Sequence, residues 1–452
     1  MTPIVTPAEM AAVDAEASES VDVLIARAGA AVARAALEML GGAYGRRVIV
    51  VAGKGNNGRD GIEAASRLRR RGAVVDVLDA TSAPAVLPPA DLVIDAAYGT
   101  GMRGSYSAPD PGGAPVLSVD IPSGLDGLTG ESSGHPPHAA RTVTFAALKP
   151  GLLFGDGPAC AGQVTVADIG LDVSRARAVL CDESDIAAMV PTRHRDAHKW
   201  QQAVWVVAGS PLMTGAAALC ATAAARAGAS YVRVSLPGVA DASALPLEAV
   251  RVSVPLIGWD RVVLADLDRI AAVAVGPGLG RSDAVRDSVS ALAQHAAVPV
   301  VIDGDGLWAI ASLSGPLSYS PRVLTPHDGE YVQLAGHPPG VDRIRAAREL
   351  AANRGAVVLL KGPTTVVAEP SGRVRLVTAG DERLATAGTG DTLTGIIVAL
   401  LARGADAFDA AAAGALVHGL AARRCHRVGM IASDLLDPIA EVLSTDALSP
   451  RQ

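Results

Sequence analysis

Aromatic residues are scarce in this sequence. Phe, Trp and Tyr make up only 3% of its 452 residues, although hydrophobic residues of all kinds make up 50%. A chain of this length can bury a large core, which must be built from aliphatic side chains and alanine because few rings are present. The length also leaves room for two or three domains.

Cysteine and long apolar runs are scarce too. The four cysteines are scattered and form no CxxC pair, which argues against a disulfide framework or a zinc site and fits reduced cytosolic thiols. No run approaches the roughly 18 apolar residues that span a bilayer. The first residues lack the basic and apolar regions of a signal peptide. We therefore expect a soluble, cytoplasmic protein with no membrane partner.

An excess of positive charge is missing as well. The formal net charge is -7 and the pI is about 5.7, which argues against a broad surface for nucleic acid. Glycine and proline are abundant instead, with 48 and 29 residues that lie mostly between short strand-like runs. This distribution is typical of an α/β protein with many loops.

Strand and helix patterns alternate along residues 1–170. Helices are predicted over residues 8–40, as one helix or two, and over residues 61–71. Together with short strands they predict a Rossmann-like parallel sheet. The predicted strands are residues 47–52, 74–78, 92–94, 116–119, 142–145 and 164–166. Residues 171–198 lack a clear strand period and predict a linker with one helix at 182–189, before a second α/β domain at 199–452.

Five unusual segments occur in this second domain, four of them directly after strand-like runs. In an open α/β sheet the carboxyl ends of the strands form the edge where ligands bind, so the segments predict one shared site. They are GSPLMTGAA (209–217), GPGLG (276–280), LTPHDGE (324–330), KGPTT (361–365) and LATAGTGDTLTG (384–395).

The last of these segments is the most informative. Gly388, Thr389 and Gly390 precede Asp391, and an apolar run at helical spacing follows over residues 393–401. A helix that opens on a glycine turn leaves backbone N–H groups free to hold an anion. At this position Asp391 could act as a base on a substrate hydroxyl next to a phosphate bound by the helix. The same residue is also a good helix N-cap, and both interpretations stay open.

Other polar residues near strand ends also have two interpretations each. Lys361 suits a nucleotide phosphate or is a solvated charge at a strand end. His327 contacts substrate or caps a turn. Asp303 and Asp305 are turn formers, or they touch substrate or metal. Histidines without metal-ligand spacing are expected to be structural or exposed: His194, His198, His418 and His426.

Residues 190–443 resemble the ribokinase-like NAD(P)H-hydrate dehydratases in the segments GSPLMTGAA, GPGLG, LTPHDGE, LLKGPTTVV and LATAGTGDTLTGI. The resemblance implies a ribokinase-like α/β fold, with ADP as the phosphoryl donor and Mg²⁺ as a cofactor of the dehydratase. It implies Asp391 as the general base. The implied hydrate pocket consists of Ala217, Gly278, His327 and Asp391. The implied nucleotide site consists of Lys361, Gly362, Pro363, Thr364, Thr365 and Gly390.

The first domain has its own polar loops at strand ends, over residues 53–61, 95–104 and 119–127. Asn57, Asp95 and Ser123 offer oxygen ligands from three adjacent strand ends. Hard oxygen donors suit an alkali or alkaline-earth cation. Asp120 lies beside them, where it can contact a sugar hydroxyl or transfer a proton. Since Asn and Asp are also ordinary turn formers, the first loop has a purely structural alternative.

Residues 5–170 resemble the NAD(P)H-hydrate epimerase domain in the segments TPAEMAAVDAEA, LIARAGAAVA, GKGNNGRDG, VIDAAYGTGMRG and SVDIPSGLDG. The resemblance implies a potassium ion (K⁺) held by Asn57, Asp95 and Ser123, and a substrate-binding role for Asp120, which we also predict to be catalytic. Arg59 stands where the family commonly has glycine and could meet a substrate phosphate. The implied substrate loops are Asn56, Asn57, Gly58, Arg59 and Asp60, and Gly99, Thr100, Gly101, Met102, Arg103, Gly104 and Ser105.

The two resemblances together imply a bifunctional repair enzyme for hydrated NADH and NADPH (NADHX and NADPHX). The first domain would interconvert the R and S hydrates. The second would dehydrate the S form with ADP and release NAD(P)H, AMP and phosphate. The alternative is a ribokinase-like kinase for a vitamin or sugar alcohol, with an amino-terminal binding or regulatory module. We expect a homo-oligomer whose partners are small molecules, without nucleic acid.

Overall fold

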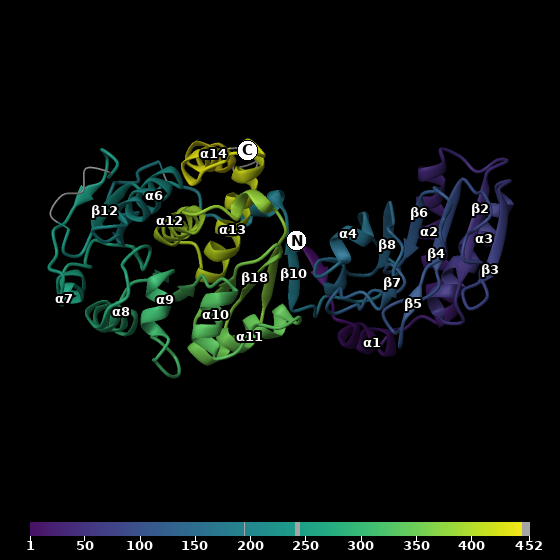
Figure 1. The fold of residues 1–452 in the computed structure, drawn as a ribbon, viewed down its shortest axis with the longest axis horizontal. Coiled ribbons are helices and arrows are strands. Elements are labelled where there is room, and N and C mark those ends of the chain that lie inside the picture. Colours follow the sequence, from purple (N-terminus) through teal and green to yellow (C-terminus); the bar gives the residue numbers. More distant parts are fainter. Residues whose placement is uncertain (194, 240–244, 445–452) are drawn as a thin grey trace. The chain divides into compact units, whose positions relative to one another are not determined.

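The computed structural model describes residues 1–193, 195–239 and 245–444, and the chain divides into two compact units, residues 2–179 and 180–452 (Figure 1). The division falls inside β10 (Ala178–Cys181), within the stretch predicted as a linker. The helix predicted in that stretch is a 3-10 turn (Glu183–Asp185) followed by α5 (Ile186–Met189). Among the described residues, every helix is too short or too polar to cross a lipid bilayer.

The amino-terminal unit is built on a six-stranded sheet in the order β3-β2-β4-β6-β8-β9, in which neighbouring strands pair in parallel. This arrangement confirms the predicted parallel fold of the first half. Its strands are β2 (Arg47–Ala52), β3 (Val74–Asp79), β4 (Leu92–Ala96), β6 (Val116–Val119), β8 (Arg141–Phe145) and β9 (Gln163–Ala167). β5 (Tyr106–Ser107) and β7 (Gly134–His135) form a separate two-stranded sheet, and β1 (Thr2–Ile4) lies outside the six-stranded sheet.

The helices of this unit are α1 (Pro7–Ala15), α2 (Val21–Leu40), α3 (Asn56–Arg70) and α4 (Gly157–Ala161). α3 begins at Asn56 and not at residue 61, so the polar residues predicted in a loop occupy its first turns. Glycine explains the difference. A Cβ on Gly58 would lie 1.9 Å from the Gly53 carbonyl oxygen, and one on Gly61 would lie 2.5 Å from the Ala96 Cβ. These glycines therefore let the helix approach the strands closely.

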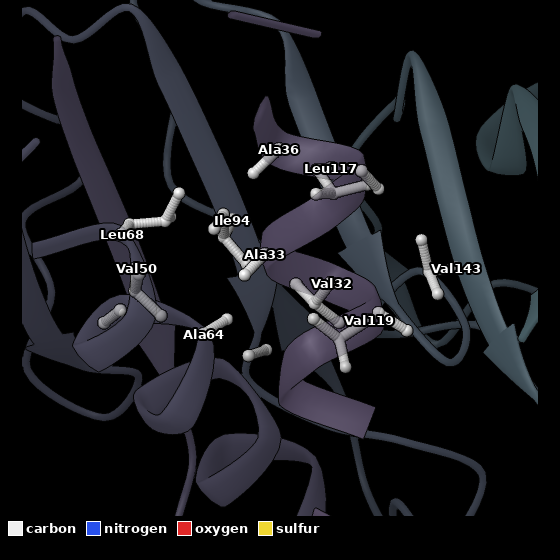
Figure 2. Packing of buried hydrophobic residues seen from close by; sticks show 14 of the residues in the cluster. Val32, Ala33, Ala36, Val50, Ala64, Leu68, Ile94, Leu117, Val119 and Val143 are labelled. Carbon is white, nitrogen blue, oxygen red and sulfur yellow. The ribbon is translucent and has the colours of Figure 1, made fainter. Parts of the chain in front are cut away.

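The core of the amino-terminal unit is aliphatic, as the composition predicts. Small side chains of α2 point toward the sheet, and α3 packs beside α2 (Figure 2). Because alanine is short, both helices can lie close to the strands without leaving voids. The labelled members of this cluster are Val32, Ala33, Ala36, Val50, Ala64, Leu68, Ile94, Leu117, Val119 and Val143.

The carboxy-terminal unit contains a larger sheet, in which the order β19-β18-β17-β16-β15-β14-β11-β12-β13 runs across the unit. In the part of the sheet that runs β17-β16-β15-β14-β11-β12-β13, every neighbouring pair is parallel. β18 pairs antiparallel with β17 and with β19. β11 is buried along its whole length, as expected of a strand covered on both faces. The bounds are β11 (Ala203–Val207), β12 (Tyr231–Ser235), β13 (Val250–Arg251), β14 (Ala272–Val275), β15 (Val300–Ile302), β16 (Arg322–Leu324), β17 (Val357–Leu360), β18 (Thr365–Ala368) and β19 (Val374–Val377).

Helices cover this sheet in two groups, α6 with α12 to α14 on one side and α7 to α11 on the other (Figure 1). α12 packs on α6 and contacts β11, β14 and β15. The largest fully buried side chains include Trp205 and Trp259. The bounds are α6 (Thr214–Arg226), α7 (Trp259–Leu264), α8 (Asp283–His295), α9 (Asp305–Ile310), α10 (Asp328–Ala335), α11 (Arg343–Arg354), α12 (Thr389–Ala402), α13 (Ala407–Arg424) and α14 (Leu436–Ser444).

Two candidate active sites

A cavity of about 500 Å³ lies in the amino-terminal unit, beside the carboxyl ends of β2, β4, β6 and β8. The predicted residues that line it are Asn56, Asn57, Asp60, Gly99, Thr100, Gly101, Met102 and Asp120. Those that do not are Gly58, Arg59, Arg103, Gly104 and Ser105. The Arg59 guanidinium instead pairs with Asp22 at 2.6 Å on the protein surface. The fold thus brings both predicted glycine-rich loops and Asp120 to one cavity.

The predicted cation ligands lie in and beside this cavity. Oδ2 of the buried Asp95 accepts hydrogen bonds from the Ser123 amide at 2.8 Å and from the Ser118 hydroxyl at 3.0 Å. Burial raises the pKa of the Asp95 carboxyl, and these hydrogen bonds oppose the shift. No described residue bonds either polar atom of the buried Asn57 amide. Such an unpaired group costs about 1–3 kcal/mol, which a ligand for its oxygen would relieve.

Asp120 follows β6 in an unusual conformation. Its φ of 64° lies in the left-handed region, which residues other than glycine seldom adopt. Its Oδ1 accepts hydrogen bonds from Lys149 Nζ at 2.6 Å and from Thr144 Oγ1 at 3.1 Å. The Lys149 side chain is only 2% exposed. Asp120 is among the residues predicted from the sequence. Lys149 is not, because its only signal there is a lone basic residue in the apolar segment 145–154.

Two further acids line the same cavity. Burial, and then the charge of Asp120, raise the pKa of Asp60 to about 8. Burial also raises the pKa of Asp14 on α1, and Lys149 opposes that shift. The cavity therefore combines a carboxyl that is neutral near pH 7 with an ion-paired aspartate, a contrast typical of sites that transfer protons.

A second cavity, of about 820 Å³, lies in the carboxy-terminal unit. It is lined by five of the six predicted nucleotide-binding residues: Lys361, Gly362, Pro363, Thr365 and Gly390. The sixth, Thr364, is buried outside the lining. His327 of the predicted hydrate pocket also lines the cavity.

The other residues predicted for the hydrate pocket lie outside this lining: Ala217, Gly278 and Asp391. Gly278 adjoins the start of α6, where a Cβ on it would lie 2.9 Å from the Cβ of Ala216. Ala217, in the first turn of α6, is fully buried. Their predicted contact with substrate stays a prediction.

α12 begins as the sequence predicts, on a glycine turn. Its N-cap is Gly388, in the left-handed conformation with φ 89°, and no side chain caps the helix. Asp391 lies inside the first turn, so the interpretation of this residue as the N-cap is wrong. The first N–H groups of a helix have no acceptor within it and carry the positive end of the helix dipole. This terminus can hold an anion beside Asp391.

The environment of Asp391 suits a general base. Burial, and then the charge of Asp303, raise the pKa of its carboxyl to about 7, and the nearby Lys361 opposes the shift. A base whose pKa lies near neutral pH combines a useful ionised fraction with a strong drive to accept a proton.

Asp303 connects four elements of the site. Oδ1 accepts hydrogen bonds from Thr325 Oγ1, after β16, at 2.7 Å and from Lys361 Nζ, after β17, at 3.0 Å. Oδ2 accepts one from Thr394 of α12 at 2.9 Å. Lys361 Nζ also lies 3.5 Å from Oε2 of Glu330. Asp303 is thus buried and does more than form a turn. Glu330 also contacts Lys361, although the sequence alone assigned it no role.

Opposing effects act on the Lys361 ammonium. Burial disfavours its charge, but the carboxylates of Asp303 and Glu330 outweigh burial and raise its pKa. Lys361 therefore stays protonated at neutral pH, in a cavity with room for a nucleotide. A fixed ammonium of this kind is a suitable partner for phosphate oxygens.

Two histidines border the second cavity. His327 caps α10, because its Nδ1 accepts hydrogen bonds from the amides of Gly329 and Glu330 at 3.0 and 3.3 Å. The capping interpretation is therefore confirmed, and the other ring nitrogen, Nε2, lies 3.5 Å from Oε1 of Glu330. His418 is buried as expected, and burial lowers its pKa to about 4. Its Nε2 lies 3.2 Å from Thr392 Oγ1 of α12.

Neither site contains a preformed cage of metal ligands. Within the described ranges, no cluster of three or more His, Cys, Asp or Glu side chains is arranged to hold a metal ion. Ions held by carbonyl, hydroxyl and amide oxygens, or by the phosphates of a substrate, do not require such a cluster.

Comparison with known families gives two matches that divide the chain as the two units do. The NAD(P)H-hydrate dehydratase model matches residues 204–443. The model described as YjeF-related protein N-terminus matches residues 21–87 and 79–151. The first match contains the whole lining of the larger cavity, and the second contains most of the lining of the smaller one.

Curated relatives combine both parts in one chain. The bifunctional NAD(P)H-hydrate repair enzyme Nnr of Mycobacterium tuberculosis strain H37Rv is 40% identical over 407 residues, which cover 82% of each chain. The enzyme of the same name from Moorella thermoacetica is 35% identical over 510 residues, covering 97% of this chain and 96% of its own.

Solved structures resemble the carboxy-terminal unit. The ADP/ATP-dependent NAD(P)H-hydrate dehydratase of Bacillus subtilis, co-crystallised with ATP and Mg²⁺, is 31% identical with a TM-score of 0.51, covering 58% of this chain and 96% of its own. A ribokinase-like superfamily protein of Enterococcus faecalis is 20% identical with a TM-score of 0.54, covering 61% of this chain and 99% of its own. The ribokinase-like fold predicted for this unit is confirmed.

Proposed function

We propose, from the premise that this chain belongs to the family of bifunctional NAD(P)H-hydrate repair enzymes, that its two units carry out two successive reactions. The amino-terminal unit interconverts the R and S hydrates of NADH and NADPH. The carboxy-terminal unit dehydrates the S hydrate with ADP and releases NAD(P)H, AMP and phosphate. The observation that carries the second activity is the placement of Asp391, with its raised pKa, in the first turn of α12.

Dehydration needs a better leaving group than hydroxide, and phosphorylation supplies it. Asp391 takes the proton of the ring hydroxyl, whose oxygen attacks the terminal phosphorus of ADP while the bond to AMP breaks. The first N–H groups of α12 and the Lys361 ammonium stabilise the charge on the transferring group. The lone pair of the ring nitrogen then expels phosphate, and loss of a proton from the neighbouring ring carbon restores the double bond.

The nucleotide is assigned to the 820 Å³ cavity. Its lining includes the Lys361 to Pro363 turn, Thr365 and Gly390, which combine one ammonium with small residues that let phosphates approach the backbone. A Cβ on Gly390 would lie 3.7 Å from both Lys361 Nζ and Asp303 Oδ2, so a larger side chain there would crowd this polar cluster. ADP as the preferred donor is part of this proposal.

The residues at the amino-terminal site fit a potassium ion. Asn57 presents a buried amide oxygen without a partner, and the Ser123 amide holds Oδ2 of Asp95 at 2.8 Å. The Ser123 hydroxyl oxygen, which bonds the backbone of Tyr98, would supply the third ligand. When bound, K⁺ would supply positive charge that anchors the loops and a substrate phosphate. Mg²⁺ in the carboxy-terminal unit would be held chiefly by nucleotide phosphates, since the described residues offer no cluster of three acidic side chains for it.

A mixture of R and S hydrates tests the proposal. With ADP, the wild-type protein should consume both epimers in one phase, followed by the absorbance of the reduced nicotinamide. Asp120→Ala should consume the S form promptly and then follow the slow spontaneous exchange of the R form. A mutant that finishes in one fast phase would show that Asp120 is dispensable or that the second site accepts both epimers. Accumulation of a stable phosphorylated product would instead favour the small-molecule kinase.

A further inference from the structure

Lys149 lies in the amino-terminal site, and no predicted motif includes it. It follows β8, and its ammonium is buried. Nζ donates hydrogen bonds to Asp120 Oδ1 at 2.6 Å, to Thr144 Oγ1 at 3.0 Å and to the Phe145 carbonyl at 2.9 Å. An ammonium has three N–H donors, so all are engaged within the protein. Lys149 therefore acts on Asp120 and does not bind a substrate directly.

The carboxylate of Asp120 is bonded on one side only. Oδ1 accepts hydrogen bonds from Lys149 and Thr144, whereas no described residue donates to Oδ2. The backbone N–H of Asp120 donates to the Val143 carbonyl at 2.7 Å, and this bond helps to hold the left-handed φ. Since Asp120 lines the 500 Å³ cavity, Oδ2 is the oxygen left for a ligand.

The ionisable side chains around this cavity are mostly acidic. Asp14 from α1 and Asp60 from α3 share it with Asp120, while α2 contributes apolar residues. Like charges favour the neutral form of a carboxyl. Lys149 is the one cationic side chain among the described residues that line the cavity. Its position against Oδ1 counteracts this repulsion at Asp120. The lining residues of α2 are Val21, Leu24, Ile25 and Ala28.

We propose that Lys149 is a positioning residue for epimerisation, which fixes Oδ1 of Asp120 so that Oδ2 transfers a proton within the hydrate. This inference rests on the proposed epimerase function of the amino-terminal unit. It adds Lys149 to the residues of that site and assigns the catalytic contact to Oδ2 of Asp120.

The chemistry requires one proton and no co-reactant. In the hydrate the hydroxyl and the ring nitrogen are bonded to the same carbon. Oδ2 takes the hydroxyl proton, the O–H electron pair forms a carbonyl, and the C–N pair leaves on the nitrogen. The nitrogen then takes the proton back from Oδ2, which yields an open amine and aldehyde. After rotation about the adjacent single bond, the reverse steps on the other carbonyl face give the opposite epimer.

Lys149→Met is the principal test variant, because it removes the charge and keeps most of the length. Full-length protein is incubated with R hydrate at several concentrations without ADP, and both epimers are separated by chromatography. We expect kcat for epimerisation to fall about 10²-fold with KM within about threefold.

Two further variants make the test decisive. Lys199→Met makes the same chemical change on an exposed lysine of the other unit and should leave kcat and KM for epimerisation unchanged. Thr144→Val removes the other donor to Oδ1 and should lower kcat by less than Lys149→Met does. It serves as the test if Lys149→Met does not fold, as judged by its circular dichroism and urea midpoint.

The outcomes separate this inference from the proposed function. A wild-type protein that does not interconvert the epimers overturns the epimerase function and this inference with it. A wild-type protein that interconverts them, with Lys149→Met matching its kcat and KM, overturns the role of Lys149 alone. A folded Lys149→Met protein with raised KM and unchanged kcat would also overturn it, since Lys149 would then serve binding.

Discussion

The Lys361 ammonium lies 3.0 Å from Oδ1 of Asp303 and joins the carboxyl end of β17 to that of β15. The pair is largely shielded from solvent, with side-chain exposures of 23% for Lys361 and 4% for Asp303. Asp303 in turn holds Thr394 of α12, the helix that carries Asp391. A single ion pair thus ties the proposed nucleotide side of the site to its proposed base.

Breaking this pair should affect both binding and stability. Lys361→Met leaves Asp303 as a buried carboxylate without its cation, which typically costs about 3–5 kcal/mol. We expect weaker ADP binding by calorimetry and a lower urea midpoint. The double variant Lys361→Met, Asp303→Asn should recover part of the stability but not the ADP affinity. Lys199→Met, on an exposed lysine of the same unit, is the matched control. Unchanged ADP affinity in Lys361→Met would exclude Lys361 from the nucleotide site.

Asp391→Asn should separate chemistry from binding. The amide keeps the shape of the side chain but cannot accept the hydroxyl proton, so dehydration should slow by about 10²-fold or more. ADP affinity and epimerisation should remain near wild-type values. Asp287→Asn, on the exposed surface of α8, provides the matched control. A variant with near wild-type kcat for dehydration would remove Asp391 from catalysis.

The rate of dehydration should depend on pH through Asp391. Its pKa is raised to about 7, and only the ionised form can act as a base. The rate should therefore level off above pH 7 and be lost as the pH falls below it. Lys361 opposes the shift, so Lys361→Met should move the transition to higher pH at saturating ADP. A kcat that stays constant as the pH falls to about 5.5 would contradict this assignment.

The proposed potassium site makes epimerisation dependent on the cation present. Replacing K⁺ with a bulky organic cation at constant ionic strength should slow epimerisation by the wild-type protein and leave dehydration unaffected. Asn57→Ala and Asp95→Asn should show slow epimerisation with either cation. Asn353→Ala, an exposed change in the other unit, is the control. If both activities fell together without unfolding, the division into two independent sites would be wrong.

The sequence predicts the parts of both sites that depend on strand ends. Four such features can be predicted from the sequence, because each follows a recognisable strand or opens a recognisable helix. They are Asp95, Asp120, Lys361 and the start of α12. The first turns of α3 could not. Gly58 and Gly61 disfavour a helix by intrinsic propensity, and only their close packing on Gly53 and Ala96 explains why the helix starts so early.

Ion pairs between distant segments were beyond prediction. Lys149 and Asp120 are 29 positions apart, and Lys361 and Asp303 are 58 positions apart. Neither spacing carries a periodic signal, because the pairs form only when parallel strands align in a particular order. β10 was missed for another reason, since four residues in a segment of mixed charge give too little pattern to register as a strand. Homo-oligomerisation stays a prediction.

The scarcity of aromatic residues has a practical consequence for spectroscopy. All four tryptophans, Trp200, Trp205, Trp259 and Trp308, belong to the carboxy-terminal unit, and the amino-terminal unit has none. Trp205 and Trp259 are fully buried, so their emission should shift to longer wavelength when that unit unfolds. Selective excitation of indole in the intact chain therefore reports on one unit alone. The unfolding of the carboxy-terminal unit can thus be followed in the intact chain, without cutting it from the other unit.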